Sequence, residues 1–450
     1  MHKSLPHEGE KFFKYLLLIL THVIVLSLFP SPSAAREATR PPRWVDALHI
    51  EWGGHLRGTA QAAFWDANTP QAALGPRTAV DSVGELRLMN RIFWGHDTYL
   101  QTHYLARIEH MDSLRTRRRF QELTAGLEEL DILQPPVHSD HTQLLDLSHT
   151  LHQRGRTRIG HRLDRLNLTL NKSWGTLRLG RQAVSWGNGL IFHPLDLFNP
   201  FSPTEVLTDY KAGEDMATAT VPLPRLGELQ LLTIPRRTEN GSVHWDRSSV
   251  AGKMNILTDM LQVDLMAAHH FDAAILGLGL TGNIGSAGWR TDITWTEIDS
   301  GEKYFSAVAN LDRSWVWGQK NWYGLLEFYY HGLGEDEPEM ALENSDLIQR
   351  LNRGEIFVLS TMYLSSALEL EVSPLVRLNM TTILNLNDAS GLMQPTVRWD
   401  LAPDLEFIAG ATVYGGSGGT EFGGFELSTP GDARTIAPSD SVFAWLTAYF

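Results

Sequence analysis

Arginine recurs at positions of one parity in several stretches of this 450-residue chain. Alternate residues of a β-strand point to the same face, so each stretch would gather its arginines on one side of a sheet. A guanidinium group carries a planar fork of donors that binds carboxylate, sulfate or phosphate through two hydrogen bonds. We therefore predict a solute path for anions, formed by Arg87, Arg91, Arg107, Arg158, Arg162, Arg178, Arg181, Gln182, Arg377 and Arg398.

Acidic residues in the same stretches offer an alternative role for these arginines. Arginine–carboxylate pairs would brace the sheet rather than bind solute, and both roles can coexist. The candidate partners are Glu85, Glu109, Asp164 and Asp400.

Asp164 and Arg181 can point inward only if the backbone is locally irregular. Leu163 and Leu166 differ in parity, which predicts a β-bulge near Asp164. Arg181 has the parity of the apolar Leu179, so it points inward only if the strand is kinked at Gly180.

The elements that must carry these residues are strands, because apolar and polar residues alternate almost throughout the chain. Between residues 48 and 450 we count about 18 strands, most of the length that a tilted strand needs to cross a bilayer. Long and tight connections alternate, and both ends of the chain fall on the side with tight turns. The sequence therefore predicts an all-β fold: a transmembrane up-and-down antiparallel β-barrel.

Aromatic residues fall near the predicted strand ends, where two girdles would meet the lipid headgroups. Next to tight turns or the N-terminus stand Trp52, Trp94, Trp174, Trp289, Trp315 and Trp317. At the ends next to long loops stand Phe64, Trp65, Phe271, Tyr304, Phe305, Tyr329 and Tyr330. The alternative is a soluble β-sandwich with an aromatic core, but such a core would not concentrate indoles at turns.

Composition excludes several classes of function. A formal charge of −14 argues against a nucleic-acid partner, and the absence of cysteine excludes thiol catalysis and disulfides. Residues 1–35 are predicted to be a signal peptide, with a basic start, an apolar core and small residues before a cleavage site. An uncleaved anchor helix is the alternative. Residues 36–450 would then form the barrel.

The last strand, "SVFAWLTAYF", alternates apolar residues and ends in Phe450. It resembles the insertion signal of Gram-negative outer-membrane barrels, which the barrel-assembly machinery reads. We expect a monomer that contacts outer-membrane lipid and lipopolysaccharide and uses no cofactor.

Two long connections stand out. Residues 112–157 are expected to be a long external loop with a helix-like part at 113–131. Residues 184–214 are too apolar for water, so we expect this segment to fold inward and constrict the channel. Within it, Trp186 would pack against the wall, Gly187 would permit close backbone approach, and Asp196 or Asn199 would pin a turn.

The stretch "LRLGRQAVSWGNGLIFHPLDLFNPFSP", followed by "YKAGEDM", resembles a segment of the alginate-export-type outer-membrane porins and their uncharacterised relatives. The resemblance covers about 40 residues. It implies an 18-stranded monomeric channel with an arginine-rich lumen that passes an anionic polysaccharide.

Other functions have weaker signals. A membrane-embedded hydrolase using Ser185, His193 and Asp196 lacks a nucleophile-elbow motif, so we do not expect an enzyme. A non-conducting adhesion or scaffold barrel remains possible on the sequence. His138, Asp140 and His141 lie close together, but their spacing matches no zinc signature and we predict no metal site.

Overall fold

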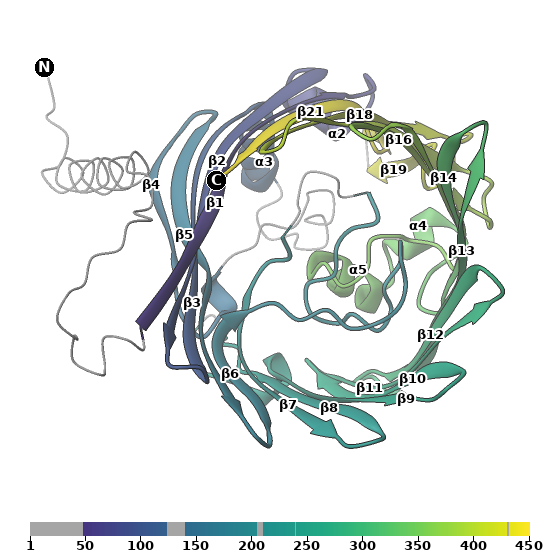
Figure 1. Ribbon diagram of the computed structural model, residues 1–450. Helices are drawn as coiled ribbons and strands as arrows, with labels where there is room; N and C mark the ends of the chain where they lie inside the picture. Colours follow the sequence, from purple (N-terminus) through teal and green to yellow (C-terminus); the bar gives the residue numbers. More distant parts are fainter. Residues whose placement is uncertain (1–47, 124–139, 205–209, 239, 430–431) are drawn as a thin grey trace, which may run out of the picture. The chain divides into compact units, whose positions relative to one another are not determined.

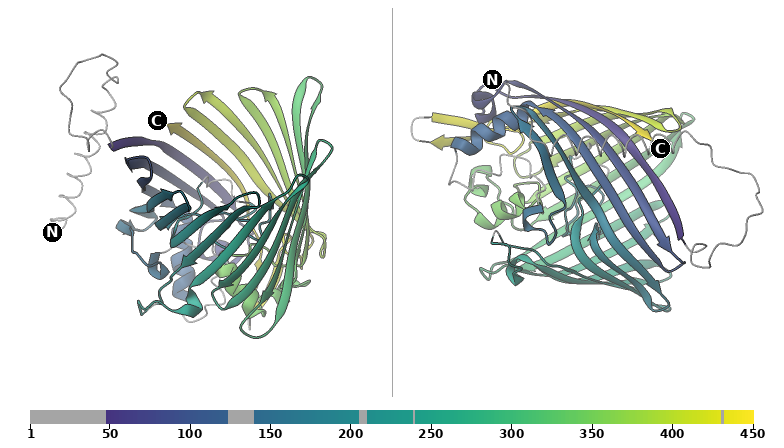
Figure 2. Two further views of the ribbon diagram at one scale, coloured as in Figure 1. Left: turned by 60° about the horizontal axis from the view of Figure 1, so that its bottom comes forward. Right: turned by 90° about the vertical axis from the view of Figure 1, so that its left-hand side faces the viewer.

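The computed structural model describes residues 48–123, 140–204, 210–238, 240–429 and 432–450. The predicted signal peptide, residues 1–35, lies outside these ranges. The unit His49–Phe450 is built almost wholly from antiparallel strands, which close into a ring in Figure 1 and run obliquely in the side view of Figure 2.

The strands follow the predicted order along the chain. The first half comprises β1 (Leu48–Phe64), β2 (Thr78–Trp94), β3 (Thr98–Met111), β4 (Ser148–Arg154), β5 (Thr157–Lys172), β6 (Gly175–Gln182), β7 (Glu214–Leu223), β8 (Gly227–Ile234), β9 (Ser249–Leu257) and β10 (Leu261–His270). The second half comprises β11 (Ala273–Ile284), β12 (Ala287–Glu297), β13 (Lys303–Trp317), β14 (Lys320–His331), β15 (Met362–Ser373), β16 (Val376–Asn385), β17 (Gly391–Ala402), β18 (Leu405–Gly415), β19 (Phe425–Thr429), β20 (Asp432–Ile436) and β21 (Asp440–Tyr449).

The main sheet closes because β21 pairs with β1 and with β18. It contains 19 strands, and 18 remain when β4, which pairs only with part of β5, is set aside. The predicted up-and-down barrel is therefore confirmed. Strands β19 and β20 form a separate hairpin that the sequence did not predict.

Among the described residues, helices occur only in connections on the rim opposite the tight turns. They are α2 (Pro70–Leu74), α3 (Asp112–Leu123), α4 (Pro338–Ala341) and α5 (Ser345–Asn352), with 3-10 turns η3 (Asp140–Thr142) and η4 (Trp245–Arg247). The helix predicted at 113–131 is confirmed as far as α3 extends; the rest of that prediction falls outside the described ranges. No helix among the described residues is long and apolar enough to cross a membrane.

The outer face of the barrel is apolar, as expected of a surface that contacts lipid. Large hydrophobic side chains at alternate positions are exposed there, and so are the turn-side tryptophans Trp52, Trp94, Trp174, Trp315 and Trp317. The prediction for Tyr329 was wrong: its ring points inward and stacks on Phe192 with 4.4 Å between ring centroids. Tyr304 also contributes to inner clusters rather than to the girdle.

Candidate functional site

The segment between β6 and β7 lies inside the ring of strands, as the teal trace in Figure 1 shows. We call its described residues 183–204 and 210–213 the inward loop. Trp186, Leu195 and Phe198 are almost completely buried, and they pack on Met216, Leu232, Ile234, Met266 and Ile275, which lie on β7, β8, β10 and β11. The apolar character that made this segment unsuitable for water thus matches an apolar patch on the inner wall.

Two wall carboxylates hold the backbone of the inward loop. Asp292 on β12 accepts the N–H groups of Asn188 and Gly189 at 2.6 and 3.1 Å. Glu327 on β14 accepts the N–H groups of residues 190, 191 and 192 at 2.8, 3.1 and 2.7 Å. Both side chains have an exposed fraction of 0%. Five consecutive backbone donors are therefore paired with two buried acceptors, which fixes the loop against the wall.

The predicted turn residues of the inward loop, Asp196 and Asn199, play different roles. The ammonium group of Lys211 donates to both oxygens of Asp196, at 2.5 and 2.6 Å, and to the carbonyl of Val184 at 2.6 Å. Asp196 therefore pins the base of the loop. Burial raises the pKa of Asp196 and lowers that of Lys211, while their mutual attraction acts the other way. Asn199 has a positive φ of 53°, a conformation that asparagine tolerates in turns.

Gly187 lies where the backbone of the inward loop comes close to Asp292 on the wall, as the sequence predicts. Its φ is 95°, and an added Cβ would lie 3.0 Å from Asp292 Oδ2 and from Leu195 Cβ. A side chain here would be strained and would crowd the carboxylate that holds the loop.

A group of arginines lines the inner face of β2, β3 and β5. Arg87, Arg165 and Arg162 all lie near the carboxylate of Asp164, with N–O distances of 2.9, 2.8 and 3.4 Å. The predicted bulge is confirmed at this point, because the register between β3 and β5 shifts and leaves Asp164 without a partner. Three guanidinium groups thus surround the carboxylate of Asp164, and Glu85 and Asp140 act electrostatically on Arg87 and Arg162 as well.

Neighbouring pairs support the bracing role as well. Arg107 donates to Glu85 at 2.7 Å, and Arg158 donates to Glu109 at 2.5 Å. Arg91 lies 3.7 Å from Glu51 and is about half exposed. Arg178 donates to the hydroxyl of Thr169 at 3.1 Å.

Arg377 and Arg398 do not join this group. They are direct cross-strand neighbours on β16 and β17, near the tight turns, and β18, β21 and β1 separate them from β2. Arg398 lies 3.6 Å from Glu406. Asp400, one of the four candidate bracing carboxylates, makes none of the ion pairs within the described ranges.

Arg181 and Gln182 do not lie on the lumen surface. They lie at a junction, where the end of β6 meets residues 140–147 and the start of β7. Gly180 has a φ of 114°, so the predicted irregularity is present. Arg181 is fully buried and donates to Asp215 at 2.9 and 3.0 Å, to Asp140 at 2.7 Å and to the Leu145 carbonyl at 2.6 Å. Gln182 is also buried and bonds to backbone carbonyls. These two residues do not line the path that we predicted for them.

This junction exists because the chain leaves the wall after β6. Residues 140–147 and β4 occupy the place beside β5 that a longer β6 would fill, and Leu147 accepts the N–H of Leu163. The connection 112–157 is therefore not wholly external, since its second half completes the wall. Its residues 124–139 are not among those described.

The residues proposed for a hydrolase are not arranged for catalysis. Asp196 is occupied by Lys211, and no hydrogen bond joins Ser185 to His193 in the part of the chain that the structure describes. A nucleophilic serine needs a histidine held by a free carboxylate.

Sequence reasoning missed Asp292, Glu327, Lys211, Asp140 and Asp215. The signal for the first two was an acidic residue at an inward position of an otherwise apolar or hydroxyl-bearing strand face. Their partners are backbone groups more than 100 residues away, which no local pattern indicates.

The fold is similar to that of solved outer-membrane proteins. OccAB1 of Acinetobacter baumannii aligns over 89% of this chain and 96% of its own, at 9% identity and a TM-score of 0.51. A BenF-like porin of Pseudomonas fluorescens Pf-5 aligns over 89% and 98%, at 10% identity and a TM-score of 0.51.

No protein-family model and no curated protein sequence matches the chain, so the resemblance to alginate-export-type porins has no support here. The likeness in structure establishes the architecture: the chain has the fold of outer-membrane porins, a closed antiparallel barrel of 18 strands.

Proposed function

We propose that the chain is a Gram-negative outer-membrane channel for passive passage of small or oligomeric, anionic solutes. The observation that carries this proposal is the group of three arginines around the carboxylate of Asp164. Within it, the Nε atoms of Arg87 and Arg162 are buried and have no hydrogen-bond partner among the described residues. Unpaired guanidinium donors attract carboxylate, sulfate or phosphate groups.

The inward loop sets the size limit of the proposed channel. It is held by Asp292, Glu327 and Lys211, so it would form a fixed constriction rather than a freely moving gate. Passage would need no cofactor, because a polar lumen lowers the cost of moving a hydrated solute across hydrocarbon.

A non-conducting adhesion or scaffold barrel is the second candidate. It is favoured by the amount of chain that folds inward: besides the inward loop, α5 lies inside the ring of strands in Figure 1. Glu421, in the connection after β18, also accepts hydrogen bonds from Tyr363 on β15 and Asn385 on β16.

Single-channel conductance in planar bilayers tests both candidates. We expect conductance steps with a preference for chloride over potassium, measured from the reversal potential in a salt gradient. Arg162→Ala should lower this preference, and so should Arg178→Ala on β6, the strand next to β5. Arg398→Ala on the distant strand β17 should change it less. A silent bilayer would favour the scaffold barrel. Unchanged selectivity in all variants would contradict an anion path along the arginines but would be compatible with a channel.

A further inference from the structure

A groove crosses the outer face of the barrel over β18, β21, β1, β2 and β3. The strands β1 to β3 face the viewer on the right of Figure 2. Residues of β1 show that this face is the outer one, because Leu56 is exposed while Arg57 is buried on the lumen side. The groove has a volume of about 580 Å³, and its floor consists of small residues: Gly58, Ala60, Gly84 and Ala444.

The two glycines of the floor have no structural reason in the barrel itself. Glycine weakens the interior of a strand, so its presence there often marks a bulge, a bend or the close approach of another molecule. Neither Gly58 nor Gly84 has a positive φ, and the strand register is unbroken at both. A Cβ atom added to either glycine would meet no atom within 4 Å. The glycines therefore leave open space above the backbone for a molecule outside the barrel.

The shape of the groove fits an acyl chain. Ile108 and Leu446 beside it are exposed, as expected on a surface that contacts lipid. Five neighbouring strands span about 19 Å, whereas one leaflet fills about half of the ~30 Å hydrocarbon core. The groove begins at His110, near the rim with long loops, and ends at Phe407, close to the tight turn between β17 and β18. It can therefore hold one chain of a lipid whose headgroup lies at the rim with long loops.

Basic side chains lie beyond the His110 end of the groove. His110 pairs with Thr157 on β5, and Thr157 pairs with Arg154 on β4. One step along the same outward row, Ile159 pairs with His152. Arg154 and His152 are both exposed, and among the described residues neither side chain has an ion pair or a hydrogen bond. An unpaired cation thus stands next to the apolar groove.

Strand β4 itself requires a polar surrounding. It pairs with β5 along one edge, and no strand of the described ranges pairs with its other edge. Open strand edges do not occur in the hydrocarbon region, so β4 belongs at the level of the lipid headgroups. A guanidinium group at this level can bind a phosphate through two hydrogen bonds.

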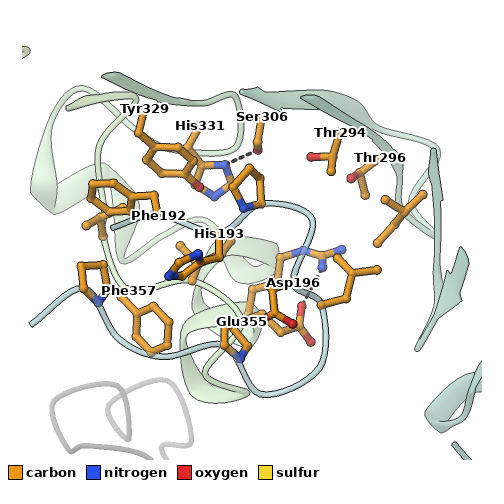
Figure 3. A pocket seen from close by; sticks show the side chains of 18 of the residues that line it. Phe192, His193, Asp196, Thr294, Thr296, Ser306, Tyr329, His331, Glu355 and Phe357 are labelled. Carbon is orange, nitrogen blue, oxygen red and sulfur yellow. Dashed lines mark hydrogen bonds and ion pairs between the residues drawn. The ribbon is translucent and has the colours of Figure 1, made fainter. Parts of the chain in front are cut away.

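Comparable groups inside the barrel are paired by the chain itself. At the chamber beside the inward loop, His331 bonds to Ser306 at 2.9 Å, as the dashed line in Figure 3 shows. Arg350 at the same chamber donates to Glu355 at 2.8 Å. Arg154 has no such partner, so its charge is available to a ligand that approaches from the membrane.

We propose that the groove and the outward side of β4 bind a phosphorylated glycolipid of the outer leaflet, such as lipid A. One acyl chain lies in the groove, and a phosphate group pairs with Arg154. A zwitterionic phospholipid fits less well, because its ammonium group would be repelled by the same guanidinium. The proposal depends on the outer-membrane location and not on conduction through the lumen.

Native mass spectrometry of the detergent-solubilised full chain, titrated with lipid A, tests the site. We expect one tightly bound lipid A per barrel. The double variant Gly58→Val, Gly84→Val fills the groove without a clash and should weaken binding about tenfold, and Arg154→Gln should weaken it about fivefold. The matched controls are Ala267→Val, an exposed outward residue of β10, and Arg313→Gln, at the tight-turn end of β13. Both should bind lipid A as the wild type does.

The proposal would be overturned if the glycine and arginine variants bound lipid A as tightly as the wild type. Equal affinity of the wild type for phosphatidylethanolamine would also overturn it, because the basic end would then not select the headgroup. A dimer of the chain that the glycine variants dissociate would show that the groove holds a second copy instead. Conductance is a separate result: a silent barrel that binds lipid A keeps this site, and a conducting barrel that does not bind it keeps the channel.

Discussion

The carboxylate of Glu327 on β14 accepts the backbone N–H of Phe192 at 2.7 Å, although 135 residues separate the two along the chain. The same side chain also holds the N–H groups of Leu190 and Ile191, and Asn310 donates to it at 3.0 Å. Because the contacts are made to the backbone, the position of the inward loop depends on the wall carboxylate more than on the side chains at 190–192.

Replacing this carboxylate should therefore release the loop. In Glu327→Gln, one amide oxygen remains as an acceptor, while the new NH2 group faces backbone donors. Each lost charge-assisted hydrogen bond is worth about 1.5–3 kcal/mol. We expect a lower thermal unfolding midpoint and a larger, noisier single-channel conductance.

Glu302→Gln is the matched control, because Glu302 is exposed on the connection between β12 and β13. If Glu327→Gln had the conductance and stability of the wild type, the loop would have to be held by its apolar contacts alone.

The buried junction at Arg181 predicts a large loss of stability. Arg181→Met removes the cation but leaves Asp140 and Asp215 buried at 4% and 3% exposure. Breaking a buried ion pair from one side costs roughly 3–5 kcal/mol. We expect a strongly lowered midpoint in thermal unfolding followed by circular dichroism. Arg377→Met, at the tight-turn end of β16, should have an unfolding midpoint close to that of the wild type. An equal loss of stability in this variant would contradict the role given to the buried ion pairs of Arg181.

Replacing Asp164 should change the preference for chloride in the opposite direction to replacing the arginines. Asp164→Asn removes the carboxylate that lies within 3.4 Å of Arg87, Arg162 and Arg165, so the local positive charge rises. The reversal potential should shift toward greater chloride preference, with some loss of stability from like-charge repulsion. Glu406→Gln, next to Arg398, serves as the control. A shift toward potassium would mean that these arginines do not face the path of the ions.

The architecture could be predicted from the sequence because a closed barrel repeats one local rule. Apolar and polar residues alternate on each strand, and the turns alternate in length, so the number of strands and their order could be read from the sequence. Even the bulge at Asp164 was visible as a change of parity. These features depend on neighbours in the sequence or on the adjacent strand.

The site was harder to predict because it depends on contacts between distant segments. Glu327 binds loop amides, and Arg181 is enclosed by a segment that returns to the wall beside β5. Its position at a strand end placed Tyr329 in the lipid girdle, but the inward loop supplies Phe192 as its partner inside. Strand β15 begins only at Met362, because the residues before it belong to the connection that follows α5.

A second inward contact predicts a dependence on pH. Glu421, in the connection after β18, accepts the Tyr363 hydroxyl at 2.6 Å, the Asn385 amide at 2.8 Å and the Leu359 N–H at 2.8 Å. Burial raises the pKa of Glu421 from 4.5 to about 7, opposed by these hydrogen bonds and aided by the nearby charge of Asp388.

Since the pKa of the folded state is the higher one, the protonated form favours the folded state. Its stabilising contribution is complete below the unfolded value of 4.5 and is lost as the pH rises through about 7. We expect the thermal unfolding midpoint to fall, and conductance to rise, between about pH 4.5 and about pH 7.5. Glu421→Gln should flatten this dependence at the low-pH level, whereas Glu426→Gln, an exposed neighbour, should keep it. A pH profile that Glu421→Gln leaves unchanged would assign the titration to another group.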